Sequence, residues 1–329
     1  MLQTRLTELF GIEHPVLNAP MGGGDAPGRL AAAVSEAGGL GLIGGTTIGG
    51  VEWLVEQIRI ARGLTECPFG VGFISHLPNA AELMAAALRE GVRIVAHSFA
   101  DPAPFVDDAH AAGAIVMCQV RTVDAARHAA DCGVDVVTAQ GTEAGGHTGM
   151  VSTLPLVPRV VDAVAPVPVV AAGGIADGRG VAAALMLGAE AVWIGTRFLA
   201  TYECGVSDAY KARVVEATGD DTVLTDVFDI ALGMPWPEGV SGRAIRNDFF
   251  DRWDGRDDAL LEWAADHRAE YRSIDGDAAI AERAVWAGEA ASFVTATEAA
   301  GDVVRGLVGE AVAVLRDRVP SVLHDRREG

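Results

Sequence analysis

Short apolar runs recur between Pro15 and about Phe198, and an amphipathic stretch rich in Ala and Leu follows each run. Hydrophobicity within the runs is continuous rather than alternating, which is typical of strands that are covered on both faces in a parallel sheet. Several of the stretches between them end in glycine, the usual residue just past a helix. The pattern predicts eight strand–helix units, with strands beginning near Pro15, Gly39, Phe69, Arg93, Ala114, Val134, Val167 and Ala189.

Eight strands that alternate with helices in this length favour a closed (β/α)8 TIM barrel of the α/β class. The rival fold is an open, doubly wound sheet, which carries a GxGxxG turn after its first strand. Here the first strand ends in the sequence NAPM, from Asn18 to Met21. We therefore predict a barrel.

The pattern changes after Tyr210. Residues 218–277 carry acidic clusters, several aromatic residues and the turn-like sequence MPWPEG, which predicts a mainly helical cap inserted after strand eight. We expect the barrel at 1–217, the cap or substrate subdomain at 218–277, and two returning helices at 278–329, the second of which closes the barrel. Four aromatic residues are expected to form the cap's own core, with a substrate pocket as the alternative: Trp236, Phe249, Trp253 and Trp263.

Charge excludes some partners. The chain has 329 residues, 25 of them basic and 45 acidic, for a formal net charge of −20, and such a surface repels nucleic acid and anionic membranes. The N-terminal stretch lacks a signal-type apolar run and no stretch has membrane-spanning length, so a cytoplasmic protein without a membrane partner is expected. The four cysteines lack CxxC or other metal-type spacing and are expected to be reduced core thiols.

The clearest local signal is a pair of loops after the seventh and eighth strands. In barrels these loops often form a phosphate site, and active sites lie at this end of the strands. Gly173 and Gly174 let backbone N–H groups approach an anion, and Thr196 adds a hydroxyl beside Gly195. A following helix N-terminus also favours negative charge. Two such loops together predict a phosphate-bearing cofactor.

His147 is the candidate catalytic residue. It follows two glycines in QGTEAGGHTG, after strand six, and an imidazole is suited to proton transfer near neutral pH. With His76 and His97 it would suggest a metal-dependent hydrolase. However, the first strand lacks a His-x-His pair and no Asp ends the eighth strand, so no metal site is predicted.

Read together, QGTEAGGHTG, NAPMGGG, AAGGIADG and GTRF make the chain resemble the nitronate monooxygenase family, also called 2-nitropropane dioxygenases, over nearly its whole length. The resemblance implies an FMN-binding barrel in which Ala19, Pro20 and Met21 run beside the flavin ring. His147 would then act as base or electrostatic anchor, and Trp286 would lie near the flavin. The full set of cofactor residues expected is Ala19, Pro20, Met21, Gly72, Gln119, Gln140, Gly145, Gly146, Ala172, Gly173, Gly174, Gly195 and Thr196.

Two of these positions depart from the family pattern. Gly72 stands where many relatives have Asn, and Gln119 stands where some carry a cation. Because of both departures, the substrate of any one family member cannot simply be assigned to this chain.

The resemblance implies FMN-dependent oxidation of alkyl nitronates with O2, giving a carbonyl compound and nitrite. The alternative is an NAD(P)H-dependent FMN reductase that acts on a quinone or an enoyl thioester. A flavin-free lyase or isomerase is disfavoured because no strand end carries a lysine, and Lys211 is the only lysine. The substrate is expected to be a small molecule. The physiological substrate, the electron donor and the oligomeric state, with a homodimer as one option, stay open.

Overall fold

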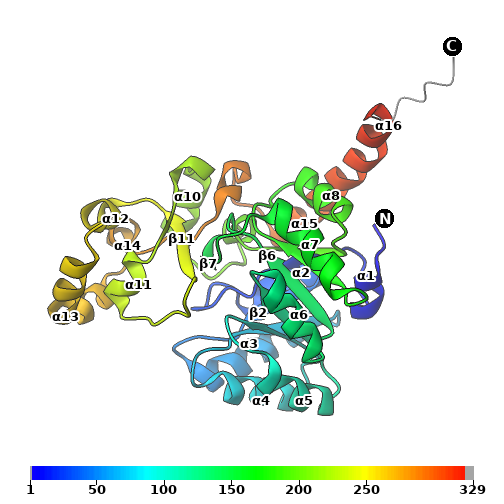
Figure 1. Cartoon of the computed structure of the whole chain (residues 1–329), viewed down its shortest axis with the longest axis horizontal. Coiled ribbons are helices and arrows are strands. Elements are labelled where there is room, and N and C mark those ends of the chain that lie inside the picture. The colour runs from blue at the N-terminus through cyan, green and yellow to red at the C-terminus, as the bar shows by residue number, and fades with distance from the viewer. Residues whose placement is uncertain (1, 323–329) are drawn as a thin grey trace.

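The computed structural model describes residues 2–322 and contains eight parallel strands arranged as a barrel (Figure 1). The strands are β1 (Val16–Asn18), β2 (Gly41–Gly44), β3 (Phe69–Ile74), β4 (Ile94–Ser98), β5 (Ile115–Val120), β6 (Val136–Gln140), β8 (Val169–Ala172) and β9 (Ala191–Ile194). They pair in the order β1-β9-β8-β6-β5-β4-β3-β2. A parallel bridge between Leu17 and Leu40 brings β1 back to the start of β2, so the barrel is nearly closed. All eight predicted strands are confirmed.

Both faces of the strands are buried, which accounts for their continuous apolar sequences. Leu17, Leu42 and Trp193 point into the barrel interior, whereas their neighbours Val16 and Ile43 pack against the outer helices. The short helix α1 (Arg5–Phe10) adds Leu6 and Phe10 to the interior cluster.

Eight helices surround the barrel. They are α2 (Gly28–Glu36), α3 (Gly50–Leu64), α4 (Ala80–Arg89), α5 (Ala103–Ala111), α6 (Val123–Asp131), α7 (Thr153–Val164), α8 (Gly178–Met186) and α15 (Ala300–Ala313). α15 packs against both α8 and α2, so the C-terminal helix takes the last place in the ring. It continues into a π-helical turn at Val314–Arg318 and α16 (Val319–Val322).

The cap follows the short helices α9 (Thr196–Leu199) and α10 (Asp208–Glu216). Its helices are α11 (Val227–Leu232), α12 (Asp248–Trp253), α13 (Asp257–Ser273) and α14 (Asp277–Glu282), with a 3-10 turn at Gly219–Asp221. They lie at the left of Figure 1, beyond a small antiparallel sheet. That sheet has the order β10-β11-β7, with β10 at Thr222–Thr225, β11 at Ser241–Ile245 and β7 at Gly146–Thr148.

The cap is mainly helical but also contains two short strands. β10 and β11 form because β11 pairs with β7 from the barrel, a long-range contact with no local signal. One prediction is corrected: the first of the two returning helices, expected over residues 278–294, is not one continuous helix. After α14 the chain instead extends, and Val285 bridges Ile245 before a 3-10 turn at Glu289–Phe293.

The four cysteines are free, but only two of them are core residues. Cys118 and Cys204 are buried, as expected, whereas Cys67 and Cys132 are partly exposed. The prediction of four core thiols is therefore half wrong. Within residues 2–322, the structure contains no helix that is both long and apolar enough to cross a membrane.

Candidate active site

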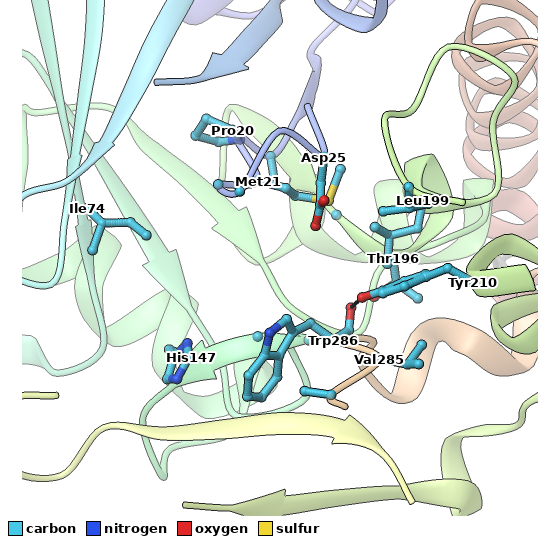
Figure 2. Close-up of a pocket in the computed structure, with 18 of the residues that line it drawn as sticks. Pro20, Met21, Asp25, Ile74, His147, Thr196, Leu199, Tyr210, Val285 and Trp286 are labelled. Carbon is cyan, nitrogen blue, oxygen red and sulfur yellow. Dashed lines mark hydrogen bonds between the residues drawn. The ribbon is translucent and has the colours of Figure 1, made fainter. Parts of the chain in front are cut away.

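A cavity of about 580 Å³ lies where the loops after the barrel strands meet the cap (Figure 2). Its volume falls within the range of about 300–1,000 Å³ that is usual for ligand sites. Pro20, Met21 and Asp25 lie on one side, and His147 and Trp286 lie across from them in the view of Figure 2. The cavity therefore occupies the position in which barrel enzymes bind their substrates.

The loop after β1 forms one wall and depends on nearby glycines. A Cβ atom at Gly72 would lie 2.2 Å from Cγ of Pro20, so the missing side chain lets the proline ring pack against β3. A Cβ atom at Gly44 would lie 1.8 Å from the carbonyl oxygen of Met21. Gly72 thus shapes the wall through Pro20 and is not itself among the residues that line the cavity.

The position of His147 is fixed by the small antiparallel sheet. His147 lies on β7 opposite Gly242 of β11. A Cβ atom at Gly242 would lie 2.3 Å from the Trp286 ring and 3.4 Å from Nε2 of His147, so glycine is needed for the two rings to sit over this strand. The side chain of His147 is only 10% exposed, which fixes its orientation beside the cavity.

Asp229 of α11 holds the imidazole from the cap side. Its Oδ2 lies 2.8 Å from Nε2 of His147, and its Oδ1 accepts a hydrogen bond of 2.9 Å from Nε1 of Trp236. An ionised carboxylate only accepts hydrogen bonds, so Nε2 carries the hydrogen. In the neutral ring, Nδ1 is then the nitrogen that can accept a proton.

Trp236 covers one face of this imidazole. The two ring centroids are 3.4 Å apart and the planes differ by 15°. Trp236 lines the cavity, so for this residue the alternative of a pocket position holds and the cap-core prediction is wrong. The cap-core prediction is confirmed for Phe249, Trp253 and Trp263, which pack together inside the cap.

His76 and His97, the other two histidines at strand ends, have environments that differ from that of His147. His97 is fully buried, its Nδ1 lies 2.8 Å from the hydroxyl of Ser75, and burial lowers its pKa to about 4. It is therefore a neutral core histidine. Burial and the neighbouring His147 lower the pKa of His76, whose ring lies 4.7 Å from that of Trp236. His147 is the one of the three that pairs with a carboxylate in the described chain.

The structure brings most of the predicted cofactor residues to the cavity. Those that line it are Ala19, Pro20, Met21, Gln119, Gln140, Gly145, Gly146, Gly195 and Thr196. Those that lie outside the lining are Gly72, Ala172, Gly173 and Gly174. Gly72 lies within β3, Ala172 is the last residue of β8, and Gly173 and Gly174 follow it directly.

Several polar groups in or beside the cavity lining have free hydrogen-bonding capacity for a flavin: an acceptor that suits its ring and donors that suit its phosphate. Oε1 of Gln140 is buried and has no hydrogen-bond partner among the described residues. The N–H groups of Gly173 and Gly174 likewise donate to no backbone group within residues 2–322, and their φ angles of 100° and 72° favour glycine. The hydroxyl oxygen of Thr196 accepts from the N–H of Gly288, which leaves its own hydrogen available for donation.

Two N–H groups in the first turn of α8, the helix that follows the Gly173–Gly174 loop, already have partners within the protein. Both partners are carboxylates: Glu310 accepts from Gly178, and Asp177 accepts from Gly180. The positive end of the α8 dipole therefore already interacts with the carboxylates of Asp177 and Glu310.

Asp25 is a cavity residue that the sequence analysis did not single out. It follows the NAPMGGG run, and Figure 2 shows its carboxyl group on the side of the cavity where Thr196 and Tyr210 lie. Burial raises its pKa to about 7. Burial also raises the pKa of Tyr210, with the charge of Asp25 adding to the effect. Burial thus favours the protonated, uncharged forms of both groups.

We expect the Asp25→Asn variant to unfold at a higher temperature than the wild-type chain at about pH 8. An unfolded Asp ionises near pH 4, whereas folded Asp25 keeps its proton up to about pH 7, so folding takes up a proton in this window and stability falls as pH rises through it. The asparagine removes this penalty. Thermal melting of both flavin-free proteins at several pH values measures the difference in melting temperature. That difference should shrink as the pH is lowered towards about 4. Equal melting temperatures at every pH would contradict this pKa.

The sequence is similar to a known protein family and to named proteins within it. The family model described as nitronate monooxygenase matches residues 3–310. The chain is 43% identical over 236 residues to a Mycobacterium tuberculosis protein named (3aS,4S,5R,7aS)-5-hydroxy-7a-methyl-1-oxo-octahydro-1H-indene-4-carboxyl-CoA dehydrogenase. That match covers 71% of this chain but 65% of the relative, just under two thirds of its length.

Two solved structures are similar over almost the whole chain. FabK from Thermotoga maritima is 33% identical with a TM-score of 0.87, and the match covers 98% of this chain and all of that one. Nitroalkane oxidase from Streptomyces ansochromogenes is 29% identical with a TM-score of 0.78, over 94% of this chain and 99% of that one. Because the family model covers most of the chain, these findings show that the chain belongs to the nitronate monooxygenase family.

Proposed function

We propose that the protein binds FMN in this cavity and oxidises alkyl nitronates with O2 to a carbonyl compound and nitrite. The observation that carries the proposal is the His147–Asp229 pair on the wall of a cavity that also contains the loops after β1 and β9. The family and the similarity to a nitroalkane oxidase support the same chemistry.

The residues of the chain have distinct parts in this proposal. Bound flavin supplies the electron-accepting chemistry, and the protein supplies position and electrostatics. The Nδ1 atom of His147 accepts the α-proton of a neutral nitroalkane, and the protonated ring then anchors the anionic nitronate. Asp229 keeps the ring in the required orientation, and Trp236 excludes water from one of its faces.

The phosphate of FMN is assigned to the loops after β8 and β9. The free N–H groups of Gly173 and Gly174 and the hydroxyl of Thr196 are the donors we assign to it. Oε1 of Gln140 would accept a hydrogen bond from the flavin ring. Ala19, Pro20 and Met21 supply apolar contact beside that ring.

A second function has specific support. The 43% identical relative is named a carboxyl-CoA dehydrogenase, and the structure of FabK matches 98% of this chain with a TM-score of 0.87. We therefore keep an NAD(P)H-dependent reductase with an enoyl-thioester or quinone acceptor as the alternative. His147 would then donate a proton to the acceptor rather than take one from the substrate.

Steady-state assays of one preparation distinguish the two functions. Oxygen uptake and nitrite release are followed with an alkyl nitronate, and NADH consumption is followed with an enoyl thioester and with a quinone. Nitrite release without any need for NADH supports nitronate oxidation. Rapid NADH oxidation that depends on the acceptor, without nitrite release from nitronates, would replace it with the reductase.

A further inference from the structure

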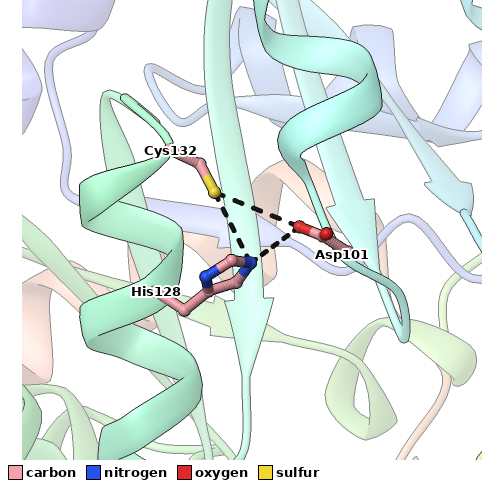
Figure 3. Close-up of side chains that lie close together, drawn as sticks. All are labelled: Asp101, His128 and Cys132. Atoms are coloured by element: carbon pink, nitrogen blue, oxygen red, sulfur yellow. Dashed lines mark hydrogen bonds and ion pairs between the residues drawn. The ribbon is translucent and has the colours of Figure 1, made fainter.

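Three side chains that can bind metals meet on the surface, outside the cavity (Figure 3). Asp101 lies in the loop between β4 and α5, whereas His128 and Cys132 lie four residues apart at the end of α6. Residues spaced by four lie on one face of a helix, so both side chains point toward Asp101. All three ligand atoms lie within 4.8 Å of one another.

The separations between these atoms are close to the edges of a tetrahedral zinc site. Nε2 of His128 lies 3.5 Å from Sγ of Cys132 and 2.8 Å from Oδ1 of Asp101, and Sγ lies 4.0 Å from that oxygen. Ordinary zinc bond lengths place a nitrogen and a sulfur about 3.6 Å apart, a nitrogen and an oxygen about 3.4 Å apart, and an oxygen and a sulfur about 3.6 Å apart. Shifts of about half an ångström therefore suffice to accept the ion.

We propose that Asp101, His128 and Cys132 bind Zn²⁺, with water in the fourth position. Imidazole, thiolate and carboxylate are the three ligand types that zinc takes in proteins. Mg²⁺ and Ca²⁺ bind almost entirely through oxygen, so a site with one carboxylate does not suit them. The side chains of His128 and Asp101 are 57% and 56% exposed, which leaves room for the water and a path for the ion.

Local hydrogen bonds hold the two halves of the site in place. The N–H of Ala103 donates to Oδ1 of Asp101 with a length of 3.0 Å, which fixes the carboxylate at the start of α5. Thr122 caps the first turn of α6 through Ala125, which anchors the helix that carries the other two ligands. Little ordering is then required when the ion binds.

The plainer interpretation is a surface ion pair between His128 and Asp101. The same chain contains a matched example in His110 and Asp135, whose Nε2 and Oδ2 atoms are 2.9 Å apart. No thiol joins that pair within the part of the chain that the structure describes. The thiol of Cys132 is what distinguishes the proposed site, and His110 therefore provides the control.

Zinc titration of the metal-stripped, reduced full-length protein tests the proposal. We expect one Zn²⁺ to bind by calorimetry, and Co²⁺ to give a thiolate charge-transfer band in a difference spectrum. Cys132→Ser and His128→Ala should each weaken binding by more than about 100-fold, beyond the usual cost of losing only an outer partner of a metal site. The control variants His110→Ala and Cys67→Ser should bind as the wild-type chain does.

Alkylation of the thiols gives a second readout that needs no variant. Zn²⁺ should slow the alkylation of Cys132 and leave that of the partly exposed Cys67 unchanged. Wild-type affinity in the Cys132→Ser protein, or equal protection of both thiols, would overturn the proposal. Circular dichroism of each variant shows that the fold is retained, so that a loss of binding reports on the ligand itself.

Discussion

The His147→Ala variant is expected to turn over a neutral nitroalkane about 10²–10⁴-fold more slowly than the wild-type chain, the usual contribution of a general base. The flavin should stay bound, because its proposed contacts come from Gln140 and from the loops after β1, β8 and β9, and none of them is made by the side chain of His147. Turnover measured at saturating substrate, together with the flavin absorbance of the same sample, checks both parts of the prediction.

The His147→Ala change also leaves the carboxylate of Asp229 without its imidazole partner, although the side chain of Asp229 is only 8% exposed. An unsatisfied buried group costs about 1–3 kcal/mol, so instability could lower the rate by itself. His147→Gln keeps an N–H donor near the Nε2 position and serves as the second variant. His110→Ala, which breaks a His–Asp pair away from the cavity, is the control. Turnover close to wild type in both variants would remove His147 from the chemistry.

The second large effect is expected from Asp229→Asn, which should lower turnover by about 10²-fold or more. The carboxylate accepts from His147 on Oδ2 and from Trp236 on Oδ1, whereas an amide has an oxygen at only one of these positions and a donating NH2 group at the other. If the amide donates to Nε2, the ring hydrogen moves to Nδ1 and the base is lost. An Asp-to-Asn change in the serine-protease triad lowers the rate by about 10⁴-fold through this loss of tautomer, which sets an upper bound.

Asp229 acts through His147, so its test needs a readout of the ring itself. The nitrogen chemical shifts of His147 should report a change of tautomer in Asp229→Asn, and kcat should fall more than KM rises. Trp236→Phe is the matched control, since it keeps the stacked ring and removes only the hydrogen bond to Asp229. We expect that variant to lose less than about tenfold. An unchanged tautomer with unchanged kcat would contradict a positioning role for Asp229.

The barrel could be predicted from the sequence because its signals are local. Each strand is buried on both faces, and the apolar run that results is visible within a few residues, as in the strand from Phe69 to Ile74. The glycine loops and His147 could be placed for the same reason: they follow strand ends, which meet at one end of a barrel.

The residues that complete the site carried no such signal. Asp229 looks like any acidic residue of a surface helix, and only the pairing of β11 with β7 brings α11 over His147. The indole of Trp236 could not be told from a core aromatic. The raised pKa of Asp25 depends on burial by the folded chain. The spacing of His128 and Cys132 alone does not indicate a metal site, because the third residue of that group, Asp101, comes from another element.

The most direct test of the account is the visible spectrum of the purified protein, taken without oxygen before and after addition of an alkyl nitronate. We predict a yellow protein that carries one FMN per chain, bleaches with the nitronate and recovers its colour when air is admitted. A yellow protein that bleaches with NADH but not with the nitronate would shift the assignment to the reductase. A colourless protein that takes up no added FMN would contradict the central claim that this cavity holds a flavin.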